Sequence, residues 1–161
     1  MTQMQTFLSI QGAIFEGENL IHFGKPDIER LATNQDIITA LSHMGILELH
    51  GEDAITFLQG QLTNDIKQLN GTNSQYSGYC NPKGRLLALF LAFAHRDHLH
   101  LQMPRTLIEP IAKRLRMYVM RSKVNIKDVS ESIIKIGLQG PNAATLLHTL
   151  FESIPQNTFD L

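Results

Sequence analysis

An unbroken apolar run from Leu86 to Ala94 is the feature that most constrains the fold of this chain. A membrane-spanning helix needs roughly 20 apolar residues, so the run is too short to be one. A tight turn at Asn81-Pro82-Lys83-Gly84 precedes the run, and a second turn at Arg96-Asp97 follows it. This arrangement predicts a central strand of an antiparallel sheet that is covered on both faces, with Gln75–Cys80 as the strand before it.

Alternating apolar and polar residues predict two further strands, one at Leu47–Leu49 and one at Leu99–Met103. Helical spacing of apolar residues predicts helices at Ile55–Ile66 and Leu107–Val119. The order strand, strand, strand, helix, strand is typical of an α+β fold, in which helices cover antiparallel sheets.

The two ends of the chain give weaker patterns. The N-terminal part predicts strands at Phe7–Ile14 and Ile21–Phe23. Asp36 is placed to cap a short helix that follows it. Near the other end, a strand at Ile134–Leu138 leads to Gly140-Pro141, a pair typical of a helix start.

Composition narrows the class of protein. Apolar residues make up 43% of the 161 residues and charged residues 18%, which is typical of a chain with a packed core. A single cysteine excludes a disulfide framework and a Cys-rich zinc site. The net charge of -1 gives no overall attraction to nucleic acid or anionic membranes. The N-terminus has no pattern of a secretory signal, so we expect a soluble cytoplasmic protein with no membrane partner.

Few residues stand out as candidates for chemistry. His98 and His100 share one face of the predicted strand, but no carboxylate or cysteine stands beside them in sequence. We therefore predict a polar strand face and no metal site. Cys80 has no base or orienting group that the sequence identifies, so we interpret it as a small buried residue and assign no catalytic residue.

Several segments resemble the YgfZ-type folate-binding proteins, which are relatives of the glycine cleavage T-protein, an aminomethyltransferase. The segments occur in the order of that family, and they are Gly51–Ala54, Phe57–Asp65, Asn81–Arg85, Tyr118–Val124 and Gly137–Ala144. The YgfZ branch carries a Lys-Gly-Cys-Tyr-x-Gly-Gln-Glu motif well downstream, and this chain ends at Leu161 before reaching it. We therefore expect an N-terminal portion of such a protein.

The resemblance implies a fold and a ligand. The implied fold is α+β, with a T-protein-like first domain (residues 1–73 plus 131–161) interrupted by a ferredoxin-like inserted domain (residues 74–130). The implied ligand is tetrahydrofolate or a one-carbon derivative of it. The residues that match pterin-lining positions of the superfamily are Met44, Tyr76, Leu101 and Met103.

One departure from the T-protein bears on activity. The T-protein carries paired aspartates after its Asn-x-x-Gly turn, and the matching positions here are Ala88 and Leu89. Neither side chain can accept a proton, which argues against aminomethyl transfer. The YgfZ branch implies instead a folate-dependent helper in iron–sulfur enzyme maturation and tRNA modification. Its implied partners are iron–sulfur enzymes or their assembly proteins.

Two alternatives stay open. The first is a tetrahydrofolate-dependent aminomethyltransferase whose acid group comes from Asp53 or Asp65. The second is an RNA- or protein-binding module that uses the basic stretch at residues 113–127, although the net charge argues against direct nucleic-acid binding.

The same basic stretch also bears on the folate hypothesis. Its candidates to attract the glutamate tail of a folate are Arg114, Arg121 and Lys123.

Overall fold

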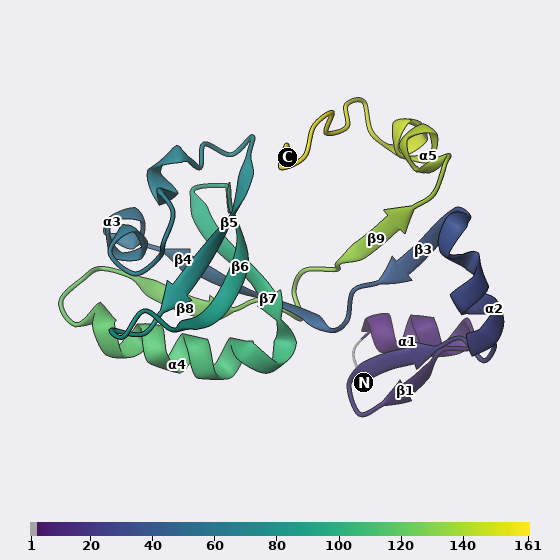
Figure 1. Ribbon diagram of the computed structural model, residues 1–161, viewed down its shortest axis with the longest axis horizontal. Helices are drawn as coiled ribbons and strands as arrows, with labels where there is room; N and C mark the ends of the chain where they lie inside the picture. The colour runs from purple at the N-terminus through teal and green to yellow at the C-terminus, as the bar shows by residue number, and fades with distance from the viewer. Residues whose placement is uncertain (1–2) are drawn as a thin grey trace. The chain divides into compact units, whose positions relative to one another are not determined.

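The computed structural model describes residues 3–161, which divide into two compact units (Figure 1). The first unit extends up to His43 and also contains Glu131–Ile154. The second unit combines Met44–Ser130 with Pro155–Leu161. No helix among residues 3–161 is long and apolar enough to cross a lipid bilayer.

The first unit contains short helices and two antiparallel strand pairs, β1 with β2 and β3 with β9. Its elements in chain order are α1 (Gln3–Ile10), β1 (Ile14–Glu16), β2 (Asn19–His22), α2 (Pro26–Leu31), a 3-10 helix (Ala32–Asn34), β3 (Ile37–Ala40), β9 (Ile136–Gln139) and α5 (Ala143–Leu150).

Two predictions for this unit are wrong. Residues 7–10 belong to helix α1 rather than to a strand, and the helix predicted after Asp36 is strand β3. The β-branched pair Ile37 and Ile38 favours an extended backbone, and β9 supplies its hydrogen-bonding partner. Asp36 still acts at a helix start, because its carboxylate accepts hydrogen bonds at 2.8 Å from the backbone N and the Nδ2 of Asn142, where α5 begins.

The second unit contains a five-stranded sheet in the order β5-β6-β7-β4-β8, and every neighbouring pair is antiparallel. The predicted α+β class with antiparallel sheets is thus confirmed. The elements of this unit are β4 (Met44–His50), α3 (Ala54–Gln59), a 3-10 helix (Ile66–Gln68), β5 (Ser74–Cys80), β6 (Leu86–His95), β7 (His98–Pro104), a 3-10 helix (Arg105–Leu107), α4 (Ile108–Val119) and β8 (Asn125–Asp128).

One face of the five-stranded sheet carries the core of the second unit, and α4 packs against it (Figure 1). The α4 residues that enter the core recur at helical spacing, and they are Ile108, Ile111, Ala112 and Leu115. They join the buried strand residues Leu47, Phe90, Leu99 and Leu101. Burial of each large side chain contributes about 1.5–3 kcal/mol.

Strand β6 is covered on one face only, which corrects the prediction of a strand covered on both faces. Ala88, Phe90 and Ala92 are buried, whereas Leu89 between them is 51% exposed. Helices α3 and α4 both contribute to the single core cluster. The side chains of β6 that alternate to the opposite face are therefore not covered by these helices.

Helix α3 is shorter than its apolar spacing predicts. It ends at Gln59 with Gly60 as the C-terminal cap, and Ile66 lies in a separate 3-10 helix. The Gln59 side chain closes the intervening turn, because its Oε1 accepts a hydrogen bond from the backbone N of Ile66 at 2.9 Å. Ile66 is still buried in the core, as its apolar spacing predicts, although the helix ends before it.

The compact units and the predicted domains share the boundary after Ser130. They differ at the first boundary and in the tail, because Pro155–Leu161 belongs to the second unit and not to the first. The second unit begins at Met44 rather than after residue 73, because β4 pairs with both β7 and β8. The two ends of the 44–130 segment lie together. The backbone N of Ile46 donates to Ser130 Oγ at 3.0 Å, and the backbone N of Val129 donates to the carbonyl of Ile46 at 3.0 Å. The inserted domain at residues 74–130 and its ferredoxin-like character stay predictions.

Candidate functional site

The sheet face opposite the core, which we call the second face, holds most of the candidate functional side chains. Strand register places Ile46, Gln102, Leu91 and Tyr76 side by side across β4, β7, β6 and β5. The next row holds Glu48, His100 and Phe93, listed from β4 to β6. Directly paired residues in antiparallel strands point to the same face, so an apolar row and a polar row lie next to each other here.

The four predicted pterin-lining residues divide between the two faces of the sheet. Leu101 and Met103 lie on one face, as predicted, but they are 0% exposed and belong to the core. Met44 and Tyr76 belong to the second face, where Met44 is half-buried and Tyr76 is 54% exposed. Of the four, only Met44 and Tyr76 are accessible from the second face, and the assignment of all four to a pterin pocket stays a prediction.

Tyr76 also contacts the last residues of the chain. Its ring lies edge-to-face with the ring of Phe159, with centroids 5.5 Å apart. Two backbone hydrogen bonds hold that tail beside β5, from Ser74 N to the carbonyl of Phe159 at 2.7 Å and from Leu161 N to the carbonyl of Thr72 at 3.0 Å. The aromatic pair gives the apolar row a boundary on the β5 side.

The positions that match the T-protein aspartates also lie on opposite faces. Ala88 is buried in the core, while Leu89 pairs with Gly78 on the second face. The two alternative acids are both held by backbone groups: Asp53 Oδ2 accepts from Lys123 N at 2.7 Å, and Asp65 Oδ1 accepts from Lys67 N at 3.1 Å. Each of these carboxylates has a local structural role that explains its presence.

A polar cluster occupies the second face around Glu48. His98 donates from Nδ1 to Glu48 Oε2 at 3.1 Å, and His50 Nδ1 lies 3.6 Å from Glu48 Oε1. His100 Nε2 lies 3.5 Å from Glu48 Oε2 and is almost fully buried. The rings of His50 and His98 stack with centroids 4.8 Å apart, and the ring of Phe93 stacks on His100 at 5.0 Å. The prediction that His98 and His100 share a face is confirmed.

The cluster shifts the pKa of two of its members. Burial by itself raises the pKa of Glu48, but the hydrogen bond from His98 and the charges of His98, His100 and His50 outweigh it and hold that pKa below its usual value. Burial lowers the pKa of His100, against the attraction of Glu48. The arrangement therefore favours an ionised carboxylate beside a neutral buried imidazole.

Sequence reasoning missed this cluster because its carboxylate comes from a distant strand. Glu48 lies on β4 and the histidine pair on β7, and only the antiparallel pairing of these strands brings them together. The alternation of Glu48 and His50 with Leu47 and Leu49 was a usable signal. It places an acid and an imidazole on the polar face of a strand.

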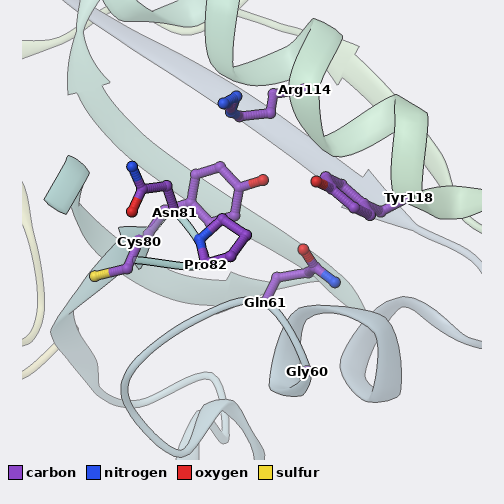
Figure 2. Close-up of a pocket in the computed structure, with 8 residues that line it drawn as sticks. Gly60, Gln61, Cys80, Asn81, Pro82, Arg114 and Tyr118 are labelled. Atoms are coloured by element: carbon purple, nitrogen blue, oxygen red, sulfur yellow. The ribbon is translucent and has the colours of Figure 1, made fainter. Parts of the chain in front are cut away.

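A small pocket lies beside the core, at the end of α4 (Figure 2). Its volume is about 220 Å³, and it is lined by Gly60, Gln61, Tyr79, Cys80, Asn81, Pro82, Arg114 and Tyr118. Figure 2 shows Arg114 and Tyr118 on α4 opposite Gln61, with the sulfur of Cys80 pointing away from both. Ligand pockets for drug-sized molecules begin at about 300 Å³, so this one is too small for a whole folate.

Tyr79 forms part of the pocket wall and gives a pH-dependent prediction. Burial raises the pKa of its phenol, the nearby Tyr118 raises it further, and Arg114 opposes the shift. A raised folded-state pKa means that the neutral phenol stabilises the fold fully below the ordinary value of about 10, and that this contribution is lost as the pH rises through the folded-state value. We expect urea unfolding to show a stability loss above about pH 10 that is smaller in Tyr79→Phe. An equal loss in both proteins would contradict the assignment.

The basic stretch at residues 113–127 is divided among several structural roles. Lys123 pairs with Glu52 at 2.6 Å, and Arg116 donates from Nη2 to the carbonyl of Ile126 at 2.9 Å. Arg114 lines the small pocket. These contacts account for Lys123 and Arg116, while the role in attracting a glutamate tail offered for Arg114 and Arg121 stays a prediction.

Comparisons with known proteins agree with this fold and with the motifs. Residues 28–160 match the family described as the GCVT N-terminal domain. A tRNA-modifying protein YgfZ from Hamiltonella defensa is 31% identical over 121 residues, which cover 75% of this chain and 36% of that protein. An aminomethyltransferase from Thermoanaerobacter sp. is 30% identical over 114 residues, covering 70% of this chain and 31% of that protein.

A solved structure shares the fold. The glycine cleavage system aminomethyltransferase T from Bartonella henselae superposes with a TM-score of 0.76 at 20% sequence identity, covering 91% of this chain and 42% of that chain. The chain thus spans about a third of the length of the curated relatives that it matches. Because residues 28–160 match the family model, this chain belongs to the GCVT N-terminal domain family.

Proposed function

We propose that this chain is part of a tetrahydrofolate-binding protein of the YgfZ type, and that the second face of the sheet supplies one wall of the folate site. The observation that carries the proposal is the row of Tyr76, Leu91 and Gln102, which combines an exposed aromatic ring, an aliphatic side chain and an amide on adjacent strands. Ligand sites for flat heterocycles are built from such apolar surface with a few polar groups.

Each member of the row has a distinct expected role. The ring of Tyr76 offers a stacking surface for the pterin, and Leu91 extends it. Gln102 is half-buried, and its amide can both donate and accept hydrogen bonds to the ring edge. Met44, half-buried at the start of β4, borders the same wall.

Under this proposal, the pterin-lining role that the resemblance gives to Leu101 and Met103 on β7 passes to another residue of that strand. Strand alternation turns Leu101 and Met103 into the core, so the β7 side chain that faces the ligand is Gln102. The aliphatic Leu89 replaces a carboxylate on this wall, which favours binding of a folate without aminomethyl transfer.

The cellular role proposed is that of a helper protein. The curated relatives named tRNA-modifying protein YgfZ support a role in tRNA modification. We extend this to maturation of iron–sulfur enzymes in the cytoplasm, with those enzymes or their assembly proteins as partners. The aminomethyltransferase relatives define the competing role, and turnover with a tetrahydrofolate acceptor would establish it instead.

Binding of tetrahydrofolate to the purified chain tests the folate wall. We expect Tyr76→Ala to weaken binding about 5- to 100-fold in anaerobic calorimetry, the range for loss of one aromatic stacking partner. Tyr118→Ala is the matched control, because Tyr118 is a similarly exposed tyrosine on α4. In NMR spectra, the ligand should shift the amide signals of Tyr76, Leu91 and Gln102. Equal affinity in both variants, or shifts confined to the small pocket, would refute the wall assignment.

A further inference from the structure

We propose that Glu48, His50 and His98 form a binding site for a divalent transition metal, with Zn²⁺ as the best chemical match. One donor atom from each of these residues lies within 4.8 Å of the others. Imidazole nitrogens with one carboxylate oxygen are a ligand set that zinc commonly takes in proteins. The site is distinct from the proposed folate wall, since it uses the polar row and not the apolar one.

The donor spacing is close to what the metal requires. Bond lengths of about 2.0–2.1 Å place neighbouring ligands of a tetrahedral zinc ion about 3.3–3.4 Å apart. The carboxylate oxygens of Glu48 lie 3.1 Å from His98 Nδ1 and 3.6 Å from His50 Nδ1. These two contacts involve different oxygens of the carboxylate. Side-chain rotations that shorten the His50–His98 separation, with release of the Nδ1 proton that His98 donates to Glu48, would bring all three donors to one ion.

An unsatisfied nitrogen marks the site independently of that spacing. His50 Nδ1 is shielded from solvent and has no hydrogen-bond partner among the described residues, although its ring is partly exposed. A shielded polar atom without a partner costs roughly 1–3 kcal/mol, and a metal bond to this nitrogen would remove that cost. His100 Nδ1 is likewise shielded from solvent, within a ring that is almost fully buried and that meets the backbone of His98.

His100 is a positioning residue in this proposal. Its Nε2 faces Glu48 Oε2 at 3.5 Å from the buried side, and the stacked ring of Phe93 fixes its orientation. Contacts of this kind orient a ligating carboxylate and raise metal affinity. On the solvent side, the rings of His50 and His98 are 35% and 39% exposed, so the ion has a route in from solution.

The rigid sheet supports the site. Glu48 and His50 are two residues apart on β4, and His98 lies on β7, the strand paired with it. Ligands on two hydrogen-bonded strands need little reorganisation to bind. The competing explanation is a hydrogen-bonded polar cluster that binds no metal, centred on the contact between His98 and Glu48.

Titration of the whole 161-residue chain with ZnCl₂ separates these explanations. We expect one ion per chain with a dissociation constant in the micromolar range or below, and a rise in Tm with added zinc. Glu48→Gln and His98→Asn should each weaken binding at least about tenfold, and His100→Asn should weaken it less. The matched control is His148→Asn, because His148 is an exposed histidine on α5.

A spectroscopic readout keeps the test valid if one variant folds poorly. CoCl₂ bound by nitrogen and oxygen ligands in tetrahedral geometry gives visible absorption bands, which His50→Asn should abolish while circular dichroism stays unchanged. The proposal is overturned by the absence of saturable binding, by equal affinity in Glu48→Gln and the original chain, or by equal losses in His148→Asn. Each measurement is made without folate, so its result does not depend on whether the second face binds folate.

Discussion

Leu101→Ala is expected to lower the free energy of unfolding by about 2–5 kcal/mol. Leu101 is fully buried on β7 between Leu47 and Ala92 of the neighbouring strands. Removing its branched end leaves a cavity beneath α4, because a sheet held by two paired strands relaxes only partly. Urea unfolding followed by circular dichroism measures the change.

Leu89→Ala is the matched control for this prediction. Leu89 is also a leucine on a strand of the same sheet, but it is half-exposed on the second face. Its truncation should change stability by no more than about 0.5 kcal/mol. Equal effects of the two substitutions would mean that Leu101 is not a core residue, and its family-based assignment to the pterin pocket would then regain support.

Gly51→Ala is expected to destabilise the chain by about 2–4 kcal/mol. Gly51 directly follows β4 and has φ at +125°, a region that side-chain-bearing residues rarely adopt. A Cβ there would lie 2.1 Å from the carbonyl oxygen of Lys123, so the backbone before β8 would have to move. That backbone is tied in place, because Lys123 N donates to Asp53 and Asp53 N donates to the carbonyl of Lys123.

Gly84→Ala measures the cost of the backbone conformation alone, without a steric clash. Gly84 has φ at +74° in the 81–84 turn, and a Cβ there would have no atom within 4 Å. Its substitution should cost only about 1–2 kcal/mol, the price of the left-handed conformation. If Gly51→Ala costs no more than Gly84→Ala in thermal unfolding, the close approach of Lys123 is not what requires glycine at residue 51.

The sequence predicted best where local pattern and tertiary environment agree. Alternation identified β4 and β7, and the 81–84 turn located the β5–β6 hairpin. The run at residues 86–94 misled, because uninterrupted apolar residues suggest two covered faces, while the structure leaves Leu89 half-exposed. Strand β3 was missed because its partner β9 lies about a hundred residues further along the chain, beyond the reach of local pattern.

The candidate site was predictable only in part. The resemblance proposed Tyr76 and Met44 as pterin-lining residues; both lie on the second face, and their role stays a prediction. It also offered Leu101 and Met103, and only strand register reveals that they point the other way. A shift of one residue along a strand exchanges the two faces, so Gln102 could not be recognised without the pairing. The histidine cluster required the same information.

The contact between the two ends of the 44–130 segment has a consequence for the order of folding. Strands β3 and β9 are far apart in sequence, and bringing them together from an unfolded chain carries a large loop-closure entropy. Once Ile46 binds Ser130, that long loop is already closed, and only the short flanking segments remain to be ordered. We infer that the contiguous sheet forms first and holds the two ends of the 44–130 segment together. Mutations in the core of that sheet should therefore slow the pairing of β3 with β9, although they touch neither strand.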